Sequence, residues 1–187
     1  SSSFGSNYTL LLEGADHITF QHMTLASDAT TYETVVAIEG GSSHITFANC
    51  AFIGDTSGTT STNAALINSN NSSSENFVTF RNSLLRGGSY GIYTSGSSVG
   101  QERGWVVENC RILPYYRGIY MANNAGFTIH GNDIISNTFA NYTSFTGIYL
   151  TSCDSIQAIT SNYINADGGI YGMYFSGVTN YMGNPAL

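Results

Sequence analysis

The chain has 187 residues, of which 42% are apolar, and this is enough to form the core of one domain. Only 9% are charged, with twelve acidic residues against five arginines and no lysine, so the net charge is −7. This balance excludes a nucleic-acid partner and disfavours an anionic membrane surface, since both need clustered cations. No apolar run approaches the ~18 residues of a membrane span, so none is expected.

Seven units with similar patterns follow one another along the chain. Each begins with a short apolar stretch, and from the fourth unit on this stretch carries a Gly-Ile-Tyr or Gly-Met-Tyr motif. The seven stretches are 10–12, 36–38, 65–67, 91–93, 118–120, 147–149 and 172–174. Counted between Leu10, Val36, Ala65, Ile92, Ile119, Ile148 and Met173, the units are 25 to 29 residues apart. Self-similarity at a fixed period of this size predicts a solenoid.

The rest of each unit holds two more short apolar stretches separated by a polar residue and Asn or Gly. Ile45 to Phe52 is the clearest copy. Period-two patterning rich in Ile, Val, Thr, Tyr and Phe predicts three short strands per unit, and no window has the pattern of a capped helix. A tight bend is expected at Asn49, Asn82 and Asn109, with Gly131 and Gly183 at the same place in later units, because both residue types tolerate the left-handed conformation.

This pattern resembles the right-handed parallel β-helix proteins, the pectin-lyase-like superfamily with its short β-helix repeats. The resemblance implies an all-β solenoid of about seven three-stranded coils, without substantial helix, over residues 1–187 as a single domain. Neither terminus supplies a cap for the open ends, so we expect an uncapped segment of a longer protein. Continuation of the β-helix or end-to-end self-association would cover these ends.

Two features of the interior and its loops can also be predicted. Cys50, Ser83 and Cys110 fall at one inward position of successive coils, two strand spacings separate the two thiols, and free core cysteines are expected. The polar stretches 69–75 and 95–104 follow the first strands of coils three and four, where we expect loops.

Alternation along the first strands predicts an aromatic ladder. If Ile92, Ile119, Ile148 and Met173 face inward, the following residues face outward, one per coil. These are Tyr93, Tyr120, Tyr149 and Tyr174. An exposed aromatic strip suits a sugar polymer, while stacked Tyr side chains also stabilise neighbouring strands; the two interpretations are compatible.

The amino-terminal end of the same face carries the candidate acidic groups. Glu13 and Glu39 end the first strands of coils one and two, so their carboxylates are expected within about 5 Å of each other. Such a pair is compatible with acid and base catalysis, with a calcium ion held with the help of Asp16, or with two side chains that splay into solvent.

For catalysis, the resemblance implies an Arg or Lys base beside a calcium-binding acidic cluster in lyases, and closely spaced Asp residues in hydrolases. The first strands of coils three to seven are predicted to have no outward Arg, Lys, Asp or Glu, which argues against both activities. The favoured hypothesis is a non-catalytic β-helix segment of a secreted or cell-surface protein, a rigid scaffold or adhesin that contacts a polysaccharide or other glycan through the Tyr ladder. The alternatives are a polysaccharide lyase or glycoside hydrolase, and a phage or filament component. No cofactor is required, and calcium is compatible with the acidic groups.

Overall fold

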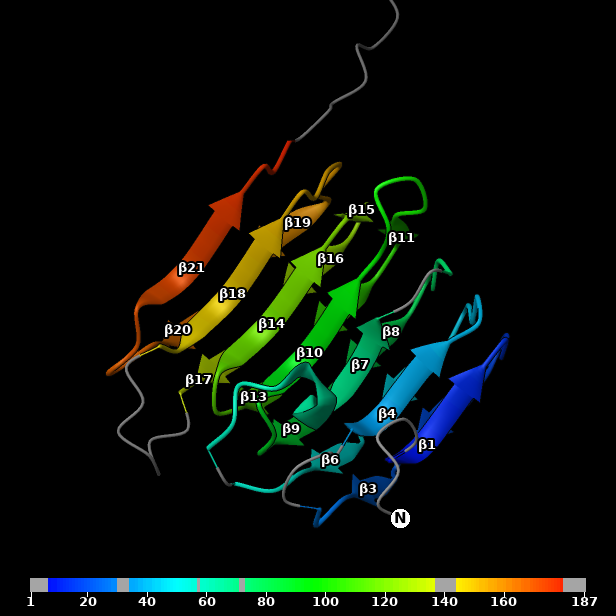
Figure 1. Ribbon diagram of the computed structural model, residues 1–187, viewed down its shortest axis with the longest axis horizontal. Coiled ribbons are helices and arrows are strands. Elements are labelled where there is room, and N and C mark those ends of the chain that lie inside the picture. The colour runs from blue at the N-terminus through cyan, green and yellow to red at the C-terminus, as the bar shows by residue number, and fades with distance from the viewer. Residues whose placement is uncertain (1–6, 30–33, 57, 71–72, 137–143, 180–187) are drawn as a thin grey trace, which may run out of the picture.

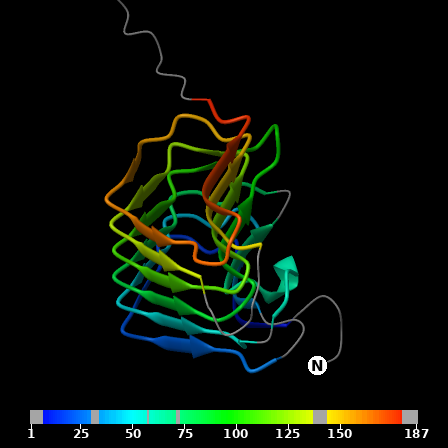
Figure 2. The same cartoon turned by 90° about the vertical axis from the view of Figure 1, so that its left-hand side faces the viewer.

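Each apolar stretch pairs in parallel with the equivalent stretch of the next unit. The computed structural model describes residues 7–29, 34–56, 58–70, 73–136 and 144–179, and these form a parallel β-solenoid with three main sheets (Figure 1). Figure 2 shows the coils stacked one above another from the blue amino-terminal coil upward. A single hydrophobic cluster runs through the interior.

The first sheet contains the seven longest strands of the molecule. In spatial order they are β1 (Tyr8–Glu13), β4 (Thr34–Glu39), β7 (Ile67–Asn70), β10 (Tyr90–Ser95), β14 (Arg117–Ala122), β18 (Thr146–Thr151) and β21 (Tyr171–Ser176). The second sheet contains β2 (Thr19–Gln21), β5 (Thr46–Ala48), β8 (Thr79–Arg81), β12 (Val106–Glu108), β16 (Thr128–His130) and β19 (Ala158–Thr160).

The third sheet completes each coil. It contains β3 (Thr24–Ala26), β6 (Ala51–Ile53), β9 (Leu84–Arg86), β13 (Arg111–Leu113), β17 (Asp133–Ile135) and β20 (Tyr163–Asn165). Two short strands, β11 (Glu102–Arg103) and β15 (Asn124–Ala125), pair at the corner between the first and second sheets, and one 3-10 turn, η1 (Thr62–Ala64), precedes β7. The described residues contain no helix long and apolar enough to cross a membrane.

The predicted all-β parallel solenoid is confirmed. Within the described residues, seven strands in the first sheet and six in each of the others make about six turns. The expected second and third strands of the last unit fall on residues 180–187, outside the described part of the chain.

The register of coil three also differs from the prediction. Ile67, not Ala65, lies between Val36 and Ile92, so the outward neighbour of Tyr93 is Asn68. The loop before β7 contains η1, which takes Ala65 out of the strand. A 3-10 turn at this corner has no apolar periodicity of its own, and therefore the repeat pattern alone aligned the wrong apolar residue.

Stacked side chains form continuous columns inside the solenoid. The rings of Phe20, Phe47 and Phe80 stack with centroid separations of 4.8 and 5.0 Å, close to the spacing of neighbouring strands. Each such pair adds roughly 0.5–1.5 kcal/mol to the burial of its rings. The core is therefore built from equivalent residues of successive coils.

The bend between the second and third sheets has the predicted left-handed residues. Asn49, Asn82, Asn109 and Gly131 have φ of 55°, 51°, 52° and 66°. Gly183 lies outside the described residues. The prediction is confirmed at the four positions, which lets the chain turn tightly between two strands of three residues.

The residues that follow this bend form an inward polar column. The amide of Cys50 donates to Ser83 Oγ at 3.0 Å, and the amide of Cys110 donates to Asn132 Oδ1 at 2.9 Å. Both cysteines are buried free thiols, as predicted. Burial raises the pKa of Cys110 to about 12, so this thiol stays protonated at neutral pH and is inert as a nucleophile.

Close packing explains the glycine of the Gly-Ile-Tyr motif. A Cβ added at Gly118 would lie 2.4 Å from Ile134 Cγ2 on the third sheet and 2.4 Å from the Gly147 carbonyl oxygen of the next coil. Gly91 and Gly147 are equally crowded by their own neighbours. Glycine is required here because the first strand enters its sheet directly against the third sheet.

Gly118→Ala should therefore lower the free energy of unfolding by roughly 2 kcal/mol or more, since neither the backbone carbonyl nor the buried Ile can withdraw easily. Gly172→Ala is the matched control, because its new Cβ would lie 3.8 Å from the nearest atom, Ile164 Cγ2. Urea unfolding followed by circular dichroism measures both. Equal effects of the two substitutions would contradict this explanation of the motif.

Candidate functional site

The predicted Tyr ladder is present on the outer face of the first sheet. Tyr93, Tyr120, Tyr149 and Tyr174 are in register on β10, β14, β18 and β21, and all four are partly exposed. Their ring centroids are separated by 4.8, 5.2 and 4.6 Å in order along the ladder. Ile92, Ile119 and Ile148 beside them are buried, so the predicted alternation holds at these positions.

The rings of the ladder stack face to face. Interplanar angles are 4° between Tyr93 and Tyr120 and 26° for each later pair. Both faces of Tyr120 and Tyr149 are thus covered by neighbouring rings, which leaves ring edges and phenolic hydroxyls to meet a ligand. Within the described part of the chain, these four hydroxyls have no hydrogen-bond partner.

An arginine lies among these rings. The Arg117 guanidinium carbon is 4.0 Å from the Tyr149 ring centroid, 4.6 Å from that of Tyr116 and 5.2 Å from that of Tyr120. Its Nη2 donates to the Tyr116 hydroxyl at 3.0 Å, whereas its Nε is buried and has no hydrogen-bond partner among the described residues. The π faces compensate for this unpaired donor, and the cation is held firmly in place.

Arg117 corrects the prediction that the first strands of the later coils carry no outward cation. Strict alternation from Ile119 would place Arg117 inward. A Cβ at the intervening Gly118 would instead point at the interior residue Ile134, so the alternation is interrupted there. Arg117 therefore lies on the outer face of the sheet, beside the Tyr ladder. The glycine before each inward residue was the sequence signal for this shift.

Further tyrosines widen the aromatic face. Tyr90 shares the register position of Arg117, is buried, and makes edge contacts with the rings of Tyr93, Tyr116 and Tyr120. Burial raises the pKa of Tyr90 and of Tyr120, so both phenols stay protonated at neutral pH. A neutral hydroxyl both donates and accepts hydrogen bonds, as sugar hydroxyls require.

Glu13 and Glu39 occupy matched positions, as predicted, at the ends of β1 and β4. Glu13 is exposed and Glu39 is half-buried. Asp16, the third predicted calcium ligand, lies at the corner after β1, where its Oδ1 accepts a hydrogen bond from Ser43 of the next coil at 2.6 Å. Among the described residues, the ligand-type side chains that converge with Asp16 are His17 and His44.

Two buried carboxyl groups were missed by the sequence analysis. Glu75 and Glu102 come from the polar stretches predicted as loops, yet both are fully buried. Ser69 Oγ lies between them, 2.7 Å from Glu102 Oε1 and 3.3 Å from Glu75 Oε2. Ser69, Glu75 and Glu102 of these stretches therefore lie inside the corner after the first sheet.

Hydrogen bonds satisfy these carboxyls from several coils. Glu75 Oε1 accepts from the Gly41 amide at 3.0 Å and from Ser73 Oγ at 2.7 Å, while Thr94 donates to Glu102. Loss of solvent is the main cause that raises the pKa of Glu102, to about 8. The Thr94 and Ser69 hydroxyls oppose this rise, and the Glu75 carboxyl adds to it.

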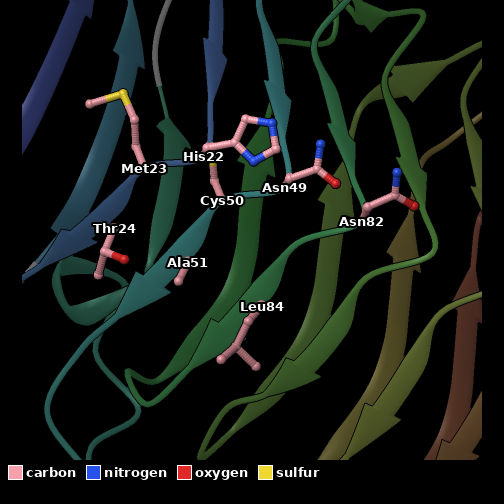
Figure 3. A pocket seen from close by; sticks show the side chains of 8 residues that line it. All are labelled: His22, Met23, Thr24, Asn49, Cys50, Ala51, Asn82 and Leu84. Atoms are coloured by element: carbon pink, nitrogen blue, oxygen red, sulfur yellow. The ribbon is translucent and has the colours of Figure 1, made fainter.

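A shallow hollow lies elsewhere, along the bend between the second and third sheets. Figure 3 shows His22, Asn49 and Asn82 side by side from three successive bends, with Cys50 and Leu84 below them. It is lined mainly by amide, imidazole and apolar groups, with no charged side chain. No ligand or reaction is assigned to this hollow. The Tyr ladder with Arg117 is the better candidate site.

Comparisons of the chain with protein-family models, with curated proteins and with solved structures gave no match. The likeness to the pectin-lyase-like superfamily thus rests on the repeat and on the parallel β-solenoid, which specify architecture rather than activity.

The Glu102 carboxyl should make stability depend on pH. Its pKa is about 8 in the folded chain and 4.5 in the unfolded chain. The contribution of this group to the free energy of unfolding is therefore fully present below pH 4.5 and is lost as pH rises through 8. The wild-type chain should lose on the order of a few kcal/mol over this window. Glu102→Gln, which keeps the shape and stays neutral, should remove this loss.

The measurement is urea unfolding of both proteins at several pH values from 4.5 to 8.5. Glu13→Gln, at an exposed acid on β1, is the control and should follow the wild-type curve. A constant difference between wild type and Glu102→Gln across the window would disprove the assignment.

Proposed function

We propose that this chain is a non-catalytic β-solenoid segment of a secreted or cell-surface protein, a rigid scaffold that contacts glycans through its Tyr face. We define the Tyr face as Tyr93, Tyr120, Tyr149 and Tyr174 together with Arg117 and Tyr116. The observation that carries the proposal is the unbroken ring stack on four successive strands.

The geometry of the stack supports a linear ligand. The four stacked rings span three strand spacings, about 15 Å, which is longer than one sugar ring. The ladder runs along the solenoid axis, and its free hydroxyls recur at each coil. A polymer with its own repeated hydroxyls is the class of ligand that such a row of donors and acceptors fits best.

The stack also stabilises the solenoid, and this role is compatible with binding. Each stacked pair contributes roughly 0.5–1.5 kcal/mol, and the Arg117 guanidinium adds cation–π attraction to Tyr149. Since the ring faces are already engaged with one another, binding is proposed to use edges and hydroxyls. The stacked rings thus differ from the exposed aromatic strip that the sequence predicted.

Cleavage of a polysaccharide is the second candidate, and Arg117 is the observation that favours it. The resemblance implies an Arg or Lys base for lyases, and Arg117 lies on the first-sheet face. Glu13 and Glu39 are on the same sheet but at its other end, on β1 and β4, so no described acidic side chain of the first sheet accompanies Arg117 on β14. This separation is why the non-catalytic proposal is preferred.

A structural component that assembles end to end is the third candidate. Met173 and Phe175 on β21 occupy positions whose equivalents in β18, Ile148 and Leu150, are fully buried. They remain 53% and 47% exposed, so this end of the described solenoid presents core side chains to its surroundings.

The test is a panel of plant, algal and bacterial polysaccharides, screened by affinity electrophoresis with and without calcium. Tyr120→Phe/Tyr149→Phe keeps the ring stack and removes two hydroxyls. We expect binding to at least one polysaccharide by wild type, weakened about tenfold or more by the double substitution, with an unchanged melting temperature. The matched control is Tyr163→Phe, at an exposed tyrosine on β20 of the third sheet.

Retention unaffected by the double substitution, or no retention on the whole panel, would reject the Tyr face as a glycan site. Newly formed chain ends that are lost in Glu13→Gln, Glu39→Gln or Arg117→Gln would make the protein an enzyme.

A further inference from the structure

A compact group of metal-binding side chains lies at the corner between the first and second sheets. Asp16 and His17 follow β1, and Ser43 and His44 hold the equivalent positions after β4, where Asp16 and Ser43 form a parallel bridge. The imidazoles of His17 and His44 stack with a centroid separation of 4.3 Å and an interplanar angle of 13°. All three ligand-type side chains are exposed.

The carboxylate of Asp16 lies beside a nitrogen of each imidazole. Its Oδ2 is 3.6 Å from His17 Nε2, and its Oδ1 is 3.3 Å from His44 Nδ1. Ligand bonds of 2.0–2.1 Å to a tetrahedral ion give ligand-to-ligand distances of about 3.4 Å. Both oxygen–nitrogen distances are close to that edge, although they involve different oxygens of the carboxylate.

The ligand atoms must still come closer together to hold one ion. Taken one per residue, they lie within 4.8 Å of one another, so an edge of that length has to shorten by about 1.4 Å to reach a tetrahedral edge. Rotation of the exposed His17 ring, with a turn of the Asp16 carboxylate, provides this movement without any change in the backbone, while His44 keeps its place. The fourth coordination position faces solvent and is open to water or to a ligand from a partner.

Neighbouring side chains orient two of the ligands. The Ser43 hydroxyl donates to Asp16 Oδ1 at 2.6 Å and so directs this carboxylate. The Phe77 ring stacks on His44 at 4.8 Å from the other side and fixes its plane. Such supporting contacts orient metal ligands in established sites.

The charge of the site is compatible with a bound cation. One divalent ion bound to two neutral imidazoles and a carboxylate leaves a single net positive charge in a chain of net charge −7. The next residue of the corner column after Ser43 is Asn76, which carries no competing charge.

We propose that Asp16, His17 and His44 form a surface site for a divalent transition-metal ion of the zinc class, which ties the first two coils together. Two imidazole nitrogens select zinc, copper, nickel or cobalt over calcium and magnesium, which prefer oxygen ligands. The site is independent of the Tyr face and of the proposed glycan contact.

The test uses the full chain without a histidine tag, freed of metal by a chelator and titrated with zinc chloride in a calorimeter at pH 7.5. We expect one saturable zinc ion per chain, and no uptake of calcium under the same conditions. His17→Asn and His44→Asn should each weaken zinc affinity about tenfold or more. Asparagine is chosen because Asn49, Asn82 and Asn109 already adopt the same left-handed backbone in this protein.

His22→Asn is the matched control. His22 lies on the same coil with φ of 55°, the value also found at His17, but belongs to the other bend. Its substitution should leave zinc affinity unchanged. Nuclear magnetic resonance of the imidazole nitrogens should show zinc-induced shifts at His17 and His44 and none at His22.

Absence of saturable zinc uptake by the folded wild-type chain would overturn the proposal. So would uptake that survives both His17→Asn and His44→Asn, or that is lost on His22→Asn. Melting curves of each variant without zinc confirm that the comparison is made between folded proteins.

Discussion

Parallel pairing of each strand with its equivalent in the next coil is the constraint on which the rest of this structure depends. Hydrogen bonds hold coils one strand spacing apart, so every position of the repeat becomes a column. Each column contains the residue type that recurs at that position of the repeat. Phenylalanine gives a stacked core, tyrosine gives an outer ladder, and asparagine gives a row of left-handed bends. Small local biases in sequence therefore become long, uniform surfaces.

The same constraint explains what the sequence could predict. Tyr93 and Tyr120 were placed correctly because the strands alternate regularly from the preceding isoleucine onward. Cys50, Ser83 and Cys110 were aligned for the same reason. Alternation failed where the backbone departs from a flat strand, at Gly118 beside Arg117 and at η1 before Ile67. Those departures depend on contacts between sheets, and the repeat pattern of the sequence gives no information about such contacts.

The corners were the hardest part to predict from sequence. Glu75 and Glu102 lie in polar stretches that were predicted as loops, yet both side chains are buried at the corner. Burial is possible because hydroxyls and a backbone amide from neighbouring coils donate hydrogen bonds to their carboxyl oxygens. A buried acid without such partners would cost several kcal/mol. The stacking of coils brings these partners together from some 30 positions apart in the sequence. No local sequence pattern therefore predicts this favourable environment. His17 and His44 were missed as a pair because both lie at the corner between strands, outside the stretches that the repeat pattern aligned.

Stacking also shapes the chemistry that the outer surface can offer. Rings one strand spacing apart cover each other, so a ladder on a solenoid gives up its aromatic faces and keeps its edges and hydroxyls. The cation of Arg117 is likewise engaged by four tyrosine rings before any ligand arrives. A ligand of this face must therefore compete for hydroxyls and ring edges rather than for an open platform or a free charge. An extended chain with many weak hydrogen-bonding groups meets that requirement, because its contacts accumulate along the same axis as the columns do.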